Sequence, residues 1–225
     1  MELIIKNTNP EVESFNVFIA INGWKSKLSG GLNGLFFFKY EDNFIDSIKN
    51  KELREIKHFI IKKLKNIFNS NHHILLKKNE ELKTSWEIHN HEFLKEIEVT
   101  FGKLDKKIKC YLIMSCGWGS YDINKNEVYV FYGMNNLLYT LCHEIYHLYY
   151  YNFLNKNYKG YDELKAWKLS EIIVNFSLIR GKLQKLWPNE KEYYYEKIDV
   201  EPMWKDWNNM NIKRFLDKYI YLPYM

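Results

Sequence analysis

The stretch that decides the fold of this chain is residues 140–149, TLCHEIYHLY. His143 and His147 are four residues apart, so on an α-helix their side chains lie on one face and can bind one metal ion. Glu144 points about 100° around the helix axis, which lets its carboxylate reach a water on that ion without being a ligand itself. This HExxH pattern predicts a metal-binding helix.

The residues around the motif indicate that this helix is buried. From residue 137 to residue 151, Glu144 is the only charged side chain apart from the two histidines. Charged groups are costly in a protein interior unless they are compensated, so their scarcity is typical of a core helix. We expect the helix to run from about Asn135 to Phe153.

A further helix, from about Tyr161 to Arg180, supplies two candidates for a third metal ligand. Glu171 lies in the middle of a mostly apolar helical face, where a buried carboxylate is costly unless a cation or strong hydrogen bonds compensate it, and a metal ion would do so. Glu163 lies about 80° away near the helix start, where the helix dipole alone explains an acidic residue. Glu171 is the preferred third ligand, and Glu163 is the alternative.

The remaining elements predict an α+β protein. Amphipathic spacing indicates helices at 50–69 and about 74–97, and further helical pieces at 189–197 and 208–219. Residues 110–114 and 127–132 are rich in apolar, β-branched and aromatic residues and predict two strands. Because a turn-rich segment separates them, we expect an antiparallel hairpin.

Composition and charge exclude several other classes of protein. The chain has 225 residues and a net charge of +5, without a long basic stripe, so nucleic acid is not an expected partner. Its three cysteines show no CxxC spacing, which argues against a disulfide framework or a cysteine metal site. With neither a signal peptide nor a long apolar run, we expect a cytoplasmic protein that does not cross a membrane.

The motif and its context resemble the HExxH zinc metallopeptidases, the zincins. Tyr150 and Phe153 stand where the metzincin branch has its glycine and third histidine. The similarity is therefore to the gluzincin type, which takes a glutamate from the next helix, and it covers about residues 110–180. It implies a zincin-like fold, with a small antiparallel sheet packed on the zinc-binding helix and additional helices before and after. Residues 106–225 would form the catalytic region. Residues 1–105 would form a mostly helical region of unknown role, either as a separate domain or as part of one continuous domain with the catalytic region.

This resemblance also implies a site and an activity. One Zn²⁺ ion would be bound by His143, His147 and Glu171, and Glu144 would act as general base on a metal-activated water. Asn175 occupies the place where gluzincins commonly carry a residue that supports a ligand histidine from outside the ligand set. The expected activity is hydrolysis of peptide bonds in a peptide or protein substrate.

Two further features of such enzymes have candidates here. An extended substrate can pair with a sheet edge, for which we expect Trp118, Val128 and Val130. An oxyanion stabiliser is also expected, and a tyrosine after the motif is the natural candidate because no histidine follows His147. The chain offers Tyr158, Tyr161, Tyr193, Tyr194, Tyr195, Tyr219, Tyr221 and Tyr224.

Two alternative functions stay open at this point. The string from Glu171 to Asn175 is similar to the glutamate helix of regulatory peptidases of the ImmA/IrrE type, which act on one dedicated target. They usually have alanine where this chain has Val174. The second alternative is a non-catalytic zincin-like binding protein. The substrate, the cleavage preference and the oligomeric state are open.

Overall fold

The computed structural model describes residues 1–25, 52–115, 117, 119–192 and 199–221. They form two compact units, which we describe one at a time. The sheet unit comprises Glu2–Trp86 and Lys107–Leu141, and the helical unit comprises Met1, Glu87–Lys106 and Cys142–Met225. Each unit therefore combines segments from both sides of residue 105.

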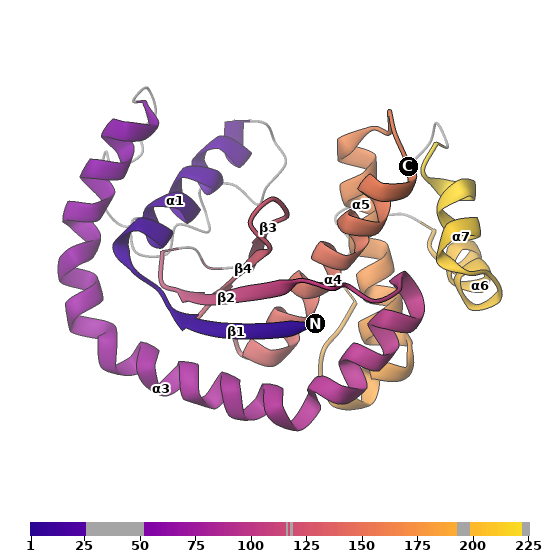
Figure 1. Cartoon of the computed structure of the whole chain (residues 1–225), viewed down its shortest axis with the longest axis horizontal. Helices are drawn as coiled ribbons and strands as arrows, with labels where there is room; N and C mark the ends of the chain where they lie inside the picture. The colour runs from indigo at the N-terminus through magenta and orange to yellow at the C-terminus, as the bar shows by residue number, and fades with distance from the viewer. Residues whose placement is uncertain (26–51, 116, 118, 193–198, 222–225) are drawn as a thin grey trace. The chain divides into compact units, whose positions relative to one another are not determined.

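The sheet unit contains a four-stranded sheet in the order β1-β2-β4-β3 (Figure 1). The strands are β1 (Glu2–Asn7), β2 (Lys107–Ile113), β3 (Ser120–Asp122) and β4 (Glu127–Phe131). β1 pairs parallel with β2, β2 pairs parallel with β4, and β3 pairs antiparallel with β4. The α+β class is confirmed, but the sheet is mixed rather than antiparallel.

The predicted hairpin between residues 110–114 and 127–132 is wrong, because these two strands run parallel. The partner of β4 in a hairpin is the three-residue strand β3. A tight turn joins them: the Asp122 carboxylate accepts the backbone N–H groups of Asn124 and Lys125, at 2.9 and 3.1 Å. Asn126 then adopts a left-handed backbone with φ of 52°, a conformation that asparagine tolerates better than most residues. This turn places β3 beside β4, so β2 pairs with the opposite side of β4.

The position of β4 corrects one expectation about a substrate-binding edge. Val128 pairs with Cys110 on one side and with Tyr121 on the other, so it offers no free main-chain edge. Val130 pairs with Leu112, one position beyond the last pair of β3, and its role stays a prediction. Trp118 lies outside the described residues.

Helix α1 (Pro10–Lys25) begins directly after β1, a strand that sequence patterning did not indicate. Asn9 caps it by accepting the N–H groups of Glu11 and Val12. The buried Glu13 carboxylate accepts the N–H groups of Met114 and Ser115, both at 2.9 Å. Burial raises the pKa of Glu13, although these hydrogen bonds oppose the shift. Glu13 thus joins α1 to the segment that follows β2.

Helix α3 (Leu53–Phe101) is one continuous helix of 49 residues, where the sequence predicted two separate helical stretches (Figure 1). The segment between those stretches, around residues 70–73, contains neither proline nor glycine. No residue there interrupts the backbone hydrogen bonds, so the helix continues.

The helical unit contains most of α4 (Leu137–Asn157), followed by α5 (Glu163–Asn175) and a π-helical turn, η2 (Phe176–Arg180). A 3-10 turn, η3 (Lys182–Leu186), and the helices α6 (Glu201–Asn209) and α7 (Ile212–Tyr219) complete it. The predicted helices at 135–153 and 161–180 are confirmed, with the last turn of the second wound as a π-helix. The piece at 208–219 corresponds to α7, and α6 was not foreseen. Of the helical piece predicted at 189–197, residues 189–192 are not helical, and residues 193–197 lie outside the described part.

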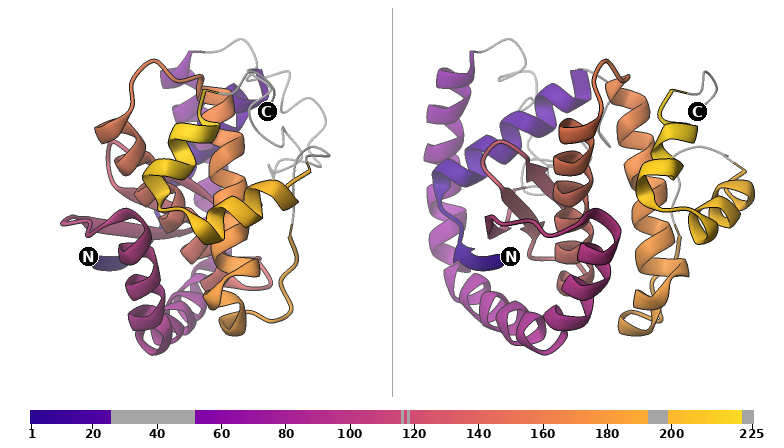
Figure 2. Two further views of the ribbon diagram at one scale, coloured as in Figure 1. Left: turned by 90° about the vertical axis from the view of Figure 1, so that its right-hand side faces the viewer. Right: turned by 45° about the vertical axis from the view of Figure 1, so that its right-hand side comes forward.

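The start of η2 is packed against the helix α6 (Figure 2). The Phe176 ring lies 5.3 Å from the ring of Trp204 and 6.3 Å from that of Trp207, both on α6. Gly181 ends the π-helical turn, and a Cβ atom there would lie 2.8 Å from the Ser177 carbonyl oxygen. Only glycine allows this close approach of the backbone.

Among the described helices, none combines the length and apolar character needed to cross a lipid bilayer.

Candidate metal centre

The motif residues lie in the middle of α4, as the sequence predicted. Leu141, Ile145 and Leu148 are fully buried and hold the helix in the core. The His147 side chain is 2% exposed, whereas that of His143 is 21% exposed. One imidazole is therefore enclosed by protein, and the other borders solvent.

Helix α5 carries the third side chain of the centre. The Asp162 carboxylate caps the helix by accepting the backbone N–H of Lys165 at 2.8 Å. Glu171 follows in the third turn, between the buried residues Ser170 and Ile172. Its own side chain is 12% exposed, so its carboxylate is largely removed from water.

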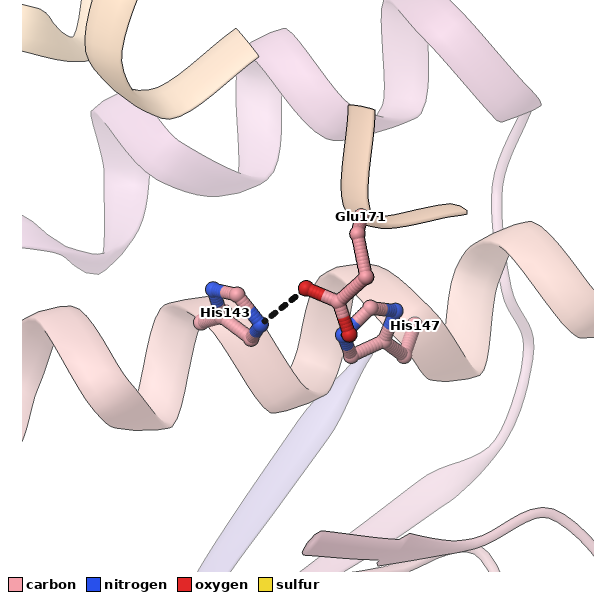
Figure 3. Close-up of side chains that lie close together, drawn as sticks. All are labelled: His143, His147 and Glu171. Atoms are coloured by element: carbon pink, nitrogen blue, oxygen red, sulfur yellow. Dashed lines mark ion pairs between the residues drawn. The ribbon is translucent and has the colours of Figure 1, made fainter. Parts of the chain in front are cut away.

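The Glu171 carboxylate lies between the two imidazoles (Figure 3). Its Oε2 atom is 3.3 Å from His143 Nε2, and its Oε1 atom is 3.3 Å from His147 Nε2. One potential ligand atom from each residue lies within 4.8 Å of the others. Two separate helices therefore bring three metal-binding groups to a single point.

Glu163, the alternative ligand, is not part of this group. It is exposed in the first turn of α5, next to the capping residue Asp162. It precedes Glu171 by eight positions, which corresponds to about 12 Å along the helix axis. Helix geometry therefore favours Glu171 as the third ligand.

The donor set fits zinc. Two imidazole nitrogens and one carboxylate oxygen are the protein ligands of many catalytic zinc sites, which keep a fourth position for water or substrate. Ligand atoms bound at about 2.0–2.1 Å in a tetrahedron lie roughly 3.3–3.4 Å from one another. Each imidazole nitrogen lies 3.3 Å from a different oxygen of Glu171, which is close to that spacing, and one potential ligand atom of each residue lies within 4.8 Å of the others.

The ionisable groups of the centre shift one another's pKa values. Burial raises the pKa of Glu171, but the two histidines outweigh this and hold it well below its usual range. Burial lowers the pKa of His147 further than Glu171 raises it, so its net shift is downward. For His143 burial also lowers the pKa, but the hydrogen bond and charge of Glu171 prevail and the net shift is upward. Glu171 is therefore an anion, as a carboxylate that binds a metal ion must be.

Glu144 is buried beside this group, with only 6% of the residue exposed. Burial raises its pKa to about 8; the charge of His143 lowers it and that of Glu171 raises it. A carboxyl group with a pKa near neutrality is suited to take up and release a proton. It is adjacent to His143 but is not one of the three clustered residues.

Asn175 lies one turn beyond Glu171 and is 3% exposed. Its side-chain amide donates to the Glu171 backbone carbonyl at 2.9 Å, which ties it to the helix that carries the carboxylate. Its expected support of a ligand histidine stays a prediction.

Four candidate oxyanion donors have hydroxyl groups that bond elsewhere in the helical unit. Tyr158 donates to Asp217, Tyr161 to Asn155, Tyr219 to Asp206, and Tyr221 to the Lys159 carbonyl. The other four, Tyr193, Tyr194, Tyr195 and Tyr224, lie outside the described residues.

Sequence reasoning missed one contact between the two ligand-bearing helices. The hydroxyl groups of Tyr146, on α4, and Ser177, on η2, form a buried hydrogen bond. Tyr146 stands inside the motif, immediately before His147, but its residue type indicates only packing. No periodicity marks Ser177 as its partner.

Searches against protein-family models, curated proteins and solved structures found no match for this chain.

Proposed function

We propose that this chain is a zinc-dependent metallopeptidase of the gluzincin type. The observation that carries the proposal is the convergence of His143, His147 and Glu171, with ligand atoms within 4.8 Å of one another. The resemblance of the motif helix and the glutamate helix to zincins supports it. The substrate class is a peptide or a protein.

Each residue of the site has a part in the proposed reaction. His143, His147 and Glu171 hold one zinc ion. When bound, zinc lowers the pKa of the attacking water and polarises the carbonyl of the scissile peptide bond. Glu144 takes the proton from that water and passes it to the amine that leaves. The His143 side chain is 21% exposed, so solvent reaches the site from the side of His143, and we expect a substrate to enter there as well.

The buried position of Glu144 supports this division of roles. Burial raises the pKa of Glu144 to about 8 when no metal ion is bound, which makes its carboxylate a stronger proton acceptor than a surface carboxylate. A bound divalent cation would lower that pKa and keep the group ionised until it takes the proton of the water. It transfers the proton onward only if the acceptor is more basic, as an amine leaving group is. A surface glutamate with an ordinary pKa would be a weaker base.

Metal removal tests the proposal. Protein loaded with one equivalent of zinc is incubated with casein and with a mixture of short peptides, and new termini are identified by mass spectrometry. We expect cleavage that a chelator such as 1,10-phenanthroline abolishes and that added zinc restores. After metal removal, the cleavage rate should fall to that of buffer alone, because a catalytic zinc ion supplies both the nucleophilic water and the polarisation of the carbonyl.

Two other outcomes would redirect the proposal. Zinc-loaded protein that cleaves neither casein nor any peptide would contradict a general peptidase and favour an enzyme with one dedicated target or an inert site. Cleavage that persists unchanged after the metal is removed would contradict metal catalysis altogether.

A further inference from the structure

We propose that Tyr146 and Ser177 are positioning residues: their hydroxyl–hydroxyl bond sets the placement of η2 and α5 against α4 that brings Glu171 onto the two histidines. This inference rests on the proposed zinc site and adds two residues to its construction. Neither side chain is among the three clustered ligand groups.

The first argument is the location of the contact. Tyr146 lies between His143 and His147 in the sequence of α4, and Ser177 lies six residues after Glu171. Helices held at one point can still rotate and slide against each other. The Glu171 contacts provide one point, and the Tyr146–Ser177 bond provides a second. Two points separated along α5 and η2 define the rotation of that helix about its axis.

The second argument is burial. Tyr146 is 0% exposed and Ser177 is 6% exposed, so water cannot easily replace either hydroxyl as a partner. The Ser177 hydroxyl would incur a desolvation cost if it lost this hydrogen bond, whereas the Tyr146 hydroxyl also interacts with the Thr100 side chain of α3. The arrangement in which the two hydroxyls meet is therefore favoured over shifted packings of the two helices.

The third argument is that further contacts fix the positions of both Tyr146 and the turn that carries Ser177. The Tyr146 ring packs edge-on against Phe101, with ring centres 5.2 Å apart and an angle of 75° between planes. On the other side, the indole N–H of Trp187 donates to the Leu178 carbonyl within the π-helical turn. Gly181 ends that turn with a backbone approach that no Cβ atom would permit. These contacts fix the backbone of the π-helical turn, and with it the position of Ser177.

The π-helical form of η2 agrees with such a role. Short π-helical turns inside α-helices occur frequently at functional sites, because they change the direction of the side chains that follow. Here the turn begins at Phe176, one residue before Ser177 and five after Glu171. The change in winding therefore falls between the metal ligand and the second contact point.

The test compares Tyr146→Phe, Ser177→Ala and the double variant with the unaltered protein. Zinc affinity is measured by competition with a chromophoric chelator, and the visible spectrum of bound Co²⁺ reports the ligand geometry. Replacing groups that orient metal ligands from outside the ligand set typically weakens metal binding about 10–100-fold. We expect a loss in that range for each single variant, with an altered Co²⁺ spectrum.

The double variant distinguishes a shared bond from two independent effects. If the hydroxyls act together, the double variant binds zinc about as weakly as the weaker single variant. Losses that multiply would show that each residue acts separately and would overturn the inference.

Matched controls separate positioning from general stability. Tyr149→Phe removes the hydroxyl group of another buried tyrosine of the same helix, about 140° around the axis from the histidine face, and this hydroxyl has no side-chain hydrogen-bond partner among the described residues. Ser170→Ala removes a buried hydroxyl of α5 that bonds the Trp167 carbonyl of its own helix. We expect both controls to keep zinc affinity within about threefold. Equal losses in controls and test variants, with equal falls in metal-free unfolding temperature, would overturn the inference.

Failure of the inference and failure of the proposed function give different results. Unaltered protein that binds no zinc refutes the proposed metal site itself. Unaltered protein that binds zinc tightly, with Tyr146→Phe and Ser177→Ala binding equally well, refutes only the positioning role.

Discussion

Zinc-loaded protein carrying Glu144→Gln is expected to bind zinc normally and to hydrolyse peptides at least ~100-fold more slowly. The amide has nearly the same shape as the carboxylate but cannot accept the proton of the attacking water. General base catalysis contributes roughly 10²–10⁴-fold to such reactions, which sets the size of the loss. Initial rates on a peptide that the unaltered protein cleaves, together with the zinc content of both samples, provide the measurement.

The variant should fold, because the buried site already disfavours the charged form of Glu144 and raises its pKa to about 8. A neutral amide therefore replaces a carboxyl group that burial itself drives toward neutrality. Glu163→Gln is the matched control, since Glu163 is exposed at the start of α5 and should tolerate the same change without effect. Full activity in Glu144→Gln would remove Glu144 from the mechanism.

The second large effect is expected at Glu171, where replacement by glutamine should abolish tight zinc binding. Glu171 is the only anionic side chain of the three clustered groups, and both of its oxygens lie 3.3 Å from an imidazole nitrogen. Changes outside the ligand set cost about 10–100-fold in metal affinity, so loss of a ligand should exceed ~100-fold. Chelator competition measures the affinity, and hydrolysis should fall in parallel.

Glu163→Gln serves again as the control, because it distinguishes the two glutamates that the sequence left as candidates. Its zinc affinity should equal that of the unaltered protein. The opposite pattern, with zinc lost in Glu163→Gln and retained in Glu171→Gln, would mean that the third ligand has been assigned to the wrong turn of α5.

The parts of the site that sequence reasoning predicted are those that depend on local helix geometry. Spacing alone places His143 and His147 on one face of α4, and the apolar surroundings of Glu171 distinguish it from Glu163. Both arguments use only the 3.6-residue period and the cost of burying a charge. The structure brings these three residues together.

The parts that were missed depend on contacts between distant segments. Apolar runs at 110–114 and 127–132 indicate strands but not their relative direction. The short strand β3 lies between them in sequence and runs antiparallel to β4, so the chain reverses twice and β4 runs parallel to β2. The strand β1 finds its partner more than 100 residues away. The π-helical turn and the Tyr146–Ser177 bond likewise arise from packing between helices, and no period in the sequence reports them.

The most direct measurement of the central claim is zinc K-edge X-ray absorption of the protein loaded with one equivalent of zinc. We expect a four-coordinate site with only nitrogen and oxygen ligands at about 2.0–2.1 Å, including two imidazoles, and a changed ligand shell in Glu171→Gln. Zinc–sulfur scattering at about 2.3 Å, or a spectrum that Glu171→Gln leaves unchanged, would contradict a centre built from His143, His147 and Glu171.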